Sequence, residues 1–139
     1  MLKQKKFLSS LQIKTSSLPD KIPLYVIKNN NKVCGVNFEA KFGINRLEIE
    51  FLNKGVNDTM VNESGEIVAD LTVEIQNLIV DEVDLTTQLK TNGVYVTNDG
   101  DIENTYGFLH KNGKFTFEFI CPPFLFLRNL EFLKNKQND

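Results

Sequence analysis

The sequence predicts an all-β fold, an antiparallel β-sandwich of jelly-roll type with short terminal segments that are helical or extended. Residues 46–53 and 71–80 alternate apolar and polar side chains, and a period of two residues is typical of half-buried strands. About eight strand-like segments follow one another at intervals of about 8–15 residues, with turn residues between them. No internal repeat and no linker divides the 139 residues, so we expect one domain.

The first two strands are expected at residues 24–27 and 33–38. The asparagine run at 29–31 predicts a tight turn between them, because asparagine tolerates a positive φ. The two strands should therefore form a hairpin. A further turn at residues 42–45 then leads into the strand at 46–53.

A polar loop, residues 54–69, follows that strand. Within it, the stretch 63–66 predicts a small turn, because apolar residues flank a Ser-Gly pair. The next strand should run from residue 71 to residue 85. We expect a bulge at residues 76–77, which would return the apolar side chains beyond it to the core.

The second half of the chain begins with a polar stretch in which residues 94–96 predict a short strand. A hairpin is then expected to join residues 108–109 to 114–120 through Asn112-Gly113, because Asn-Gly supplies the two positive φ angles of a type I′ turn. The side chains expected in the core are Leu47, Ile49, Phe51, Val73, Ile75, Phe115, Phe117 and Phe119.

The two ends of the chain are expected to lie outside the sandwich, which divides the chain into an N-terminal arm (1–21), a β-sandwich domain (22–122) and a C-terminal segment (123–139). The arm has a weak helical pattern, and residues 124–133 carry seven apolar side chains among ten. A helix docked on the sandwich buries about three or four positions per two turns. The apolar side chains beyond that number predict an attachment surface for other proteins. The alternative is that the C-terminal segment covers the open end of the sandwich and buries its apolar side chains within this chain. The attachment residues would be Leu2, Phe7, Leu8, Leu11, Phe124, Phe126, Leu130 and Phe132.

The composition excludes several classes of protein. A net charge of −2 argues against non-specific electrostatic binding to nucleic acid. Pro122, Pro123 and Arg128 interrupt the longest apolar run, so we expect no membrane span, and no apolar run near the start resembles a signal peptide. We therefore expect a protein that is made in a cytoplasm. Cys34 and Cys121 should be reduced buried thiols, although their spacing leaves a disulfide open.

No catalytic signature stands out, so we expect no enzyme. The lone His110 has no serine or cysteine nucleophile beside it in the sequence. Glu48 and Glu50 share one face of a strand, as most solvent-facing alternations do, and nothing selects them as the two acids of a glycosidase.

The polar loop is the candidate for a metal site. Asp58 and Asp70, together with further acids and amides of the loop, offer the oxygen ligands that calcium prefers. The spacing lacks the order of an EF-hand, and such residues also serve turns and caps, which is the structural alternative.

Residues 47–53 and 70–78 resemble the paired strands of small calcium-dependent xylan-binding modules. In that family an I-x-V-x-F-x-N-D strand leads through a loop into D-x-N-L-x-V-D-x-I. Here Asn53 and Asp70 match the family's Asn and first Asp, while Lys54 and Gln76 stand where the family carries acids. The resemblance implies a carbohydrate-binding module with a glycan partner. Calcium is the one cofactor to consider, with Asn53, Asp58 and Asp70 as its ligands.

The same stretch, with residues 57–59 and 106–119, also resembles small β-sandwich proteins of tailed bacteriophages. This resemblance implies a non-enzymatic structural subunit of the virion, a decoration or tail/baseplate accessory protein in a multi-copy assembly with other virion proteins. The location would then be the virion, assembled in the host cytoplasm. Because the chain lacks tryptophan, which glycan-stacking platforms favour, the virion subunit is our first hypothesis and the carbohydrate-binding module the alternative.

Overall fold

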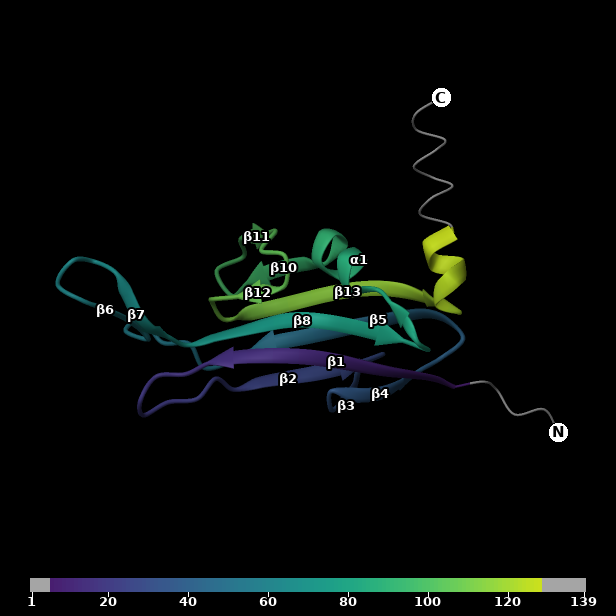
Figure 1. Cartoon of the computed structure of the whole chain (residues 1–139), viewed down its shortest axis with the longest axis horizontal. Coiled ribbons are helices and arrows are strands. Elements are labelled where there is room, and N and C mark those ends of the chain that lie inside the picture. Colours follow the sequence, from purple (N-terminus) through teal and green to yellow (C-terminus); the bar gives the residue numbers. More distant parts are fainter. Residues whose placement is uncertain (1–5, 129–139) are drawn as a thin grey trace, which may run out of the picture.

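The computed structural model describes residues 6–128 and confirms the antiparallel β-sandwich of jelly-roll type. One sheet has the strand order β12-β8-β1-β4, with β9 paired to β8 (Figure 1). Its strands are β1 (Phe7–Ser16), β4 (Asn37–Ala40), β8 (Thr72–Val80), β9 (Val83–Asp84) and β12 (Phe108–Leu109).

The second sheet has the order β11-β10-β13-β5-β2-β3. Its longest pairing joins β5 to β13 from Gly43↔Cys121 to Phe51↔Gly113. Two further strands, β6 and β7, pair only with each other and project from one end of the sandwich (Figure 1). The strands of these two units are β2 (Tyr25–Asn29), β3 (Lys32–Cys34), β5 (Gly43–Phe51), β10 (Val94–Thr97), β11 (Ile102–Glu103), β13 (Gly113–Cys121), β6 (Thr59–Val61) and β7 (Ile67–Asp70).

The core lies between the two sheets and contains all eight side chains that the alternation predicts, each at most 2% exposed. Phe117 is at its centre, stacked on Phe119 and edge-on to Phe126 at ring distances of 5.9 and 6.0 Å. The period-two pattern therefore predicts the correct face of β5, β8 and β13.

Two local predictions are also confirmed. Asn30 and Asn31 have positive φ angles of 53° and 66° in the turn between β2 and β3. The bulge in β8 is at Gln76, because Gln12 of β1 faces Asn77 while the next residue faces Ile75. It turns the apolar side chains that follow into the core, as expected.

Residues 7–16 were expected to belong to an arm outside the sandwich, and this prediction is wrong. They form β1 in the middle of the first sheet, between β8 and β4. Phe7 and Leu11 are core side chains, so they are not part of an exposed attachment surface. Leu8 points outward and is 70% exposed, as the alternation of a strand requires.

The expected Asn-Gly hairpin is also wrong. β12 pairs with β8 in one sheet, whereas β13 pairs with β5 and β10 in the other. Gly113 does not have a positive φ; a Cβ there would lie 2.5 Å from the carbonyl oxygen of Val96. Close approach of β10 therefore explains this glycine, rather than a type I′ turn. The strand expected at 33–38 likewise divides, with β3 and β4 in different sheets.

Helical structure is limited. The α1 helix (Thr86–Asn92) buries Leu89 against the core and was not predicted, since its sequence is polar. Residues 123–128 are helical; there Phe126 is buried, which corrects its assignment to the attachment surface, and Phe124 is exposed. Leu2, Leu130 and Phe132 lie outside the described residues. Within residues 6–128, no helix is long and apolar enough to cross a membrane.

Both cysteines are free thiols, which decides between the two states left open by the sequence, but Cys34 is only partly buried, contrary to the prediction. Cys121 is buried at the end of β13, and burial raises the pKa of its thiol to about 11. The thiol therefore stays protonated at neutral pH and behaves as a small apolar side chain.

Candidate functional site

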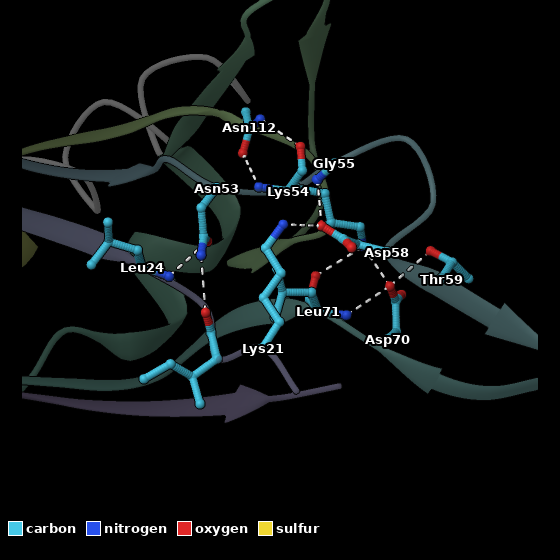
Figure 2. A network of polar contacts seen from close by, with 11 residues as sticks. Lys21, Leu24, Asn53, Lys54, Gly55, Asp58, Thr59, Asp70, Leu71 and Asn112 are labelled. Carbon is cyan, nitrogen blue, oxygen red and sulfur yellow. Dashed lines mark hydrogen bonds and ion pairs between the residues drawn. The ribbon is translucent and has the colours of Figure 1, made fainter. Parts of the chain in front are cut away.

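The predicted metal ligands come together at the end of the sandwich from which the β6–β7 hairpin projects. Asn53 follows β5, Asp58 precedes β6, and Asp70 closes β7 (Figure 2). The side chain of Asn53 accepts a hydrogen bond from the Leu24 amide at 2.7 Å and donates one to the Ile22 carbonyl at 3.0 Å. This asparagine is thus committed to holding the loop before β2 against the end of β5.

Two lysines pair with the two aspartates, and we call Lys21, Lys54, Asp58 and Asp70 the lysine–aspartate cluster. Lys21 forms an ion pair with Asp58 and Lys54 forms one with Asp70 (Figure 2). The Lys54 ammonium also donates to the Leu71 carbonyl at 2.8 Å, and only 11% of the lysine side chain is exposed.

Backbone and hydroxyl donors complete the cluster. The Gly55 amide donates to Asp58 at 2.6 Å, and the Thr59 hydroxyl donates to Asp70 at 2.8 Å. Asp58 and Asp70 therefore fix the two strands of the hairpin where they leave the sandwich.

These contacts lower the pKa of both carboxyl groups. The hydrogen bond from Lys21, followed by that from the Gly55 amide, holds the pKa of Asp58 below its ordinary value. Burial would raise the pKa of Asp70, but hydrogen bonds from Lys54 and Thr59 outweigh it, so this pKa is also lowered.

Asn53, Asp58 and Asp70 do not fit a calcium site as they stand. Calcium takes six to eight oxygen ligands, whereas here each carboxylate already faces an ammonium group that neutralises it. Among residues 6–128, no three His, Cys, Asp or Glu side chains are grouped as metal ligands would be. A lysine at position 54, where the resembling family carries an acid, is the one sequence signal that points to this arrangement.

A hollow of about 450 Å³ lies beside the cluster, and we call it the loop hollow. Its wall combines the start of the hairpin with two turns of the second half of the chain. The Asn112 side chain fixes these parts, since it accepts from the Lys54 amide at 2.7 Å and donates to the Lys54 carbonyl at 2.8 Å. The side chains that line it include Thr59, Asn98, Asp99, His110 and Lys111.

A second hollow of about 430 Å³ lies where the outer face of the first sheet meets the hairpin, and we call it the strand hollow. Phe108 lines the strand hollow, His110 lines the loop hollow, and their rings stack at 6.1 Å with an angle of 18° between the planes. The two hollows are therefore neighbours joined by a pair of rings. The strand hollow is otherwise lined mainly by Lys14, Thr15, Ser16, Asp70, Thr72 and Glu74.

The sequence did not predict these hollows, because their residues come from separate turns and strands. His110 is the one member it considered, and it lies 3.7 Å from the carboxylate of Glu103 without a nucleophile recorded beside it in the described chain. Glu48, considered as a catalytic acid, is buried and forms ion pairs with Arg46 and Lys114 at 3.0 and 3.4 Å. Neither residue therefore forms part of a recognisable catalytic pair.

No family model matches the sequence, and no curated protein matches it. Among solved structures the chain is similar to the selenomethionine form of vCBM60, described in work on a circular permutation that links two families of calcium-dependent carbohydrate-binding modules. The likeness covers 81% of this chain and 90% of that chain, with 12% identity and a TM-score of 0.47. A TM-score below 0.5 carries no inference about ligand or metal. The resemblance to phage proteins finds no support in these comparisons.

The lowered pKa values predict how the cluster responds to acid. A carboxyl group whose pKa is lower in the folded protein adds stability above its unfolded value, near 3.8 for aspartate, and loses it as the pH falls through the folded value. We expect Tm to fall below about pH 4. The double variant Asp58→Asn/Asp70→Asn should have a lower Tm at pH 7 and a shallower fall in acid.

Thermal melts followed by circular dichroism between pH 2.5 and 7 measure both effects, on the order of a few degrees. The matched control is Asp99→Asn/Asp101→Asn, which changes two exposed aspartates without a recorded ion pair in the described chain. If the two double variants melted alike at every pH, the cluster would not stabilise the protein through these charges.

Proposed function

We propose that the protein is a non-catalytic carbohydrate-binding module whose glycan lies in the loop hollow and the strand hollow. The observation that carries this proposal is the ring pair of Phe108 and His110, which joins two hollows lined by hydroxyl, amide and charged side chains. A sugar ring is complementary to such a site, because its edge carries hydroxyl groups and its C–H face is apolar.

The polar groups of the loop hollow suit hydroxyl recognition. Asn98 and Asp99 lie in a turn whose backbone is fixed, since the Asn98 amide donates to the Asn112 carbonyl at 3.0 Å. Each added hydrogen bond contributes about 0.5–1.5 kcal/mol net, so a few of them with one stacked ring support weak, micromolar to millimolar binding. Phe108 is 39% exposed, which leaves part of its ring free for a sugar face.

Calcium has no part in this proposal, because the two aspartates expected as its ligands, Asp58 and Asp70, already pair with lysines. The cluster instead holds the hairpin and the wall of the loop hollow in place. The position of the glycan is therefore fixed by protein contacts alone.

A glycan array read in EDTA and again in calcium tests the proposal. We expect the same glycans to bind in both buffers, and Asn98→Ala and His110→Ala to weaken binding about tenfold, which corresponds to about 1.4 kcal/mol. The matched control is Asn37→Ala, an exposed asparagine on β4 that lines neither hollow. An array without any bound glycan would refute glycan binding, and binding seen only in calcium would refute the role given to the lysines.

The second candidate is an assembly subunit, the first hypothesis from the sequence. The observation that favours it is the β6–β7 hairpin, whose side chains are exposed on both faces. Virion location and virion partners remain predictions from the resemblance to phage proteins. Copurification of the protein with virus particles, together with a silent glycan array, would favour this candidate over the first.

A further inference from the structure

The β6–β7 hairpin is unusual because it exposes large apolar side chains while pairing with no other strand of the described chain. A lone two-stranded hairpin is marginal in water, and this one is held only at its base by the lysine–aspartate cluster. Exposed apolar patches of this kind mark interaction surfaces. The exposed side chains are Val56, Met60, Val61, Ile67 and Val68, with exposed fractions from 44% to 101%.

The charge of the hairpin is purely acidic. Residues 55–70 contain four acids and no lysine or arginine. The lysines of the cluster neutralise Asp58 and Asp70, whereas Glu63 and Glu66, at the turn, have no ion pair recorded within residues 6–128. A partner for this hairpin must therefore be apolar and basic.

The opposite end of the same molecule has this chemistry. Phe42, between β4 and β5, and Ile44, the second residue of β5, are 69% and 64% exposed. Exposed Lys41 precedes them, and exposed Lys32 begins β3 after the turn at residues 30–31; neither lysine has a recorded ion pair in the part of the chain that the structure describes. We call Lys32, Lys41, Phe42 and Ile44 the basic end.

Asn45 holds the basic end together. Its side chain accepts hydrogen bonds from the Lys41 amide and from the side chain of Asn30, each at 3.0 Å. It also donates to the Lys41 carbonyl at 2.9 Å. The turn that carries Lys41 and the turn that precedes Lys32 are thereby fixed side by side, so the basic end is a preformed surface.

A chain cannot place its hairpin on its own basic end. The two surfaces lie at opposite ends of β5, because Gly43 begins this strand and Phe51 precedes the hairpin segment. Nine strand residues span roughly 26 Å at about 3.3 Å per residue. The two ends of the sandwich are also well separated in Figure 1.

We propose that the hairpin of one copy docks on the basic end of a second copy, with Glu63 and Glu66 facing Lys32 and Lys41 and the apolar side chains covered between them. The contact joins two different surfaces, so it repeats from copy to copy and builds rings or filaments rather than a closed pair. This inference names the partner of the second candidate function and does not depend on glycan binding.

Charge reversal and mixing test the proposal with the full chain. By analytical ultracentrifugation at on the order of 100 µM, the wild type should show species larger than the 15.9 kDa monomer. Glu63→Lys/Glu66→Lys alone and Lys32→Glu/Lys41→Glu alone should each be monomeric, with at least tenfold weaker association. In a 1:1 mixture of the two variants, each hairpin finds a surface of opposite charge only on the other variant, so species larger than the monomer should form again, with the two variants alternating. The chain with all four reversals should associate again.

The matched control is Glu82→Lys/Asp101→Lys, which makes the same charge change at exposed acids outside both surfaces and should associate like the wild type. Circular dichroism of each variant establishes that the sandwich is folded. A monomeric wild type, or equal association of every variant, would overturn the proposal. Copurification with another protein by a monomeric wild type would instead keep an assembly function and reject the second copy as partner.

Discussion

Phe117→Ala is expected to lower the free energy of unfolding by about 3–5 kcal/mol, the cost of a large cavity in a packed core. The side chain is 1% exposed and touches aromatic rings on two sides, at Phe119 and Phe126, so its removal leaves a space that neighbouring strands cannot close. For a chain of this length the loss corresponds to a fall in Tm of about 10–20 °C.

Chemical denaturation followed by circular dichroism measures this loss. Phe42→Ala is the matched control, because it removes the same side chain from a position that is 69% exposed and should change stability by less than about 0.5 kcal/mol. Equal effects of the two substitutions would mean that Phe117 does not lie in the core.

Gly113→Ala is expected to lower the free energy of unfolding by about 2–3 kcal/mol, because it forces a methyl group against packed backbone. The added methyl group would lie 2.5 Å from the Val96 carbonyl oxygen and 2.8 Å from the Cα of Thr97, and both are backbone atoms that cannot rotate away. β10 must therefore move off β13. Because the turn after β10 forms one wall of the loop hollow, we also expect weaker glycan binding.

Gly35→Ala is the matched control for this substitution. A Cβ at Gly35 meets nothing within 4 Å, and its φ is not in the left-handed region, so stability should be unchanged or rise slightly. Urea unfolding of the two variants compares them directly. If Gly113→Ala were as stable as the control, β10 would not pass as close to β13 as described.

The sequence predicts the centre of the fold better than its first strand. Residues 47–51, 71–75 and 115–119 alternate strictly between apolar and polar side chains, which leaves one choice of face for each strand. Phe7 and Leu11, by contrast, are four residues apart, a spacing that suits a helix as well as a strand. Ser9 lies between them and is buried, which the hydrophobic pattern does not anticipate; its hydroxyl donates to the Phe7 carbonyl at 2.9 Å.

The candidate site was predicted only in part, because its partners are distant in sequence. The chain places Asp58 and Asp70 together, as a metal site would require. The lysines that neutralise them are 37 and 16 residues away, and no periodicity connects these positions. The type I′ turn expected at Asn112-Gly113 was wrong for a related reason. The contact of Asn112 with Lys54, which is 58 residues away in the sequence, overrides the local preference of Asn-Gly for a turn.

Nuclear magnetic resonance can establish whether a glycan occupies the two hollows at the base of the hairpin. The amide spectrum of the labelled protein is recorded in EDTA while a glycan from the array is added. We expect that the signals which shift belong to residues of the loop hollow and the strand hollow, above all Asn98, Phe108 and His110. Shifts confined to the outer face of the second sheet, or none until calcium is added, would contradict this expectation.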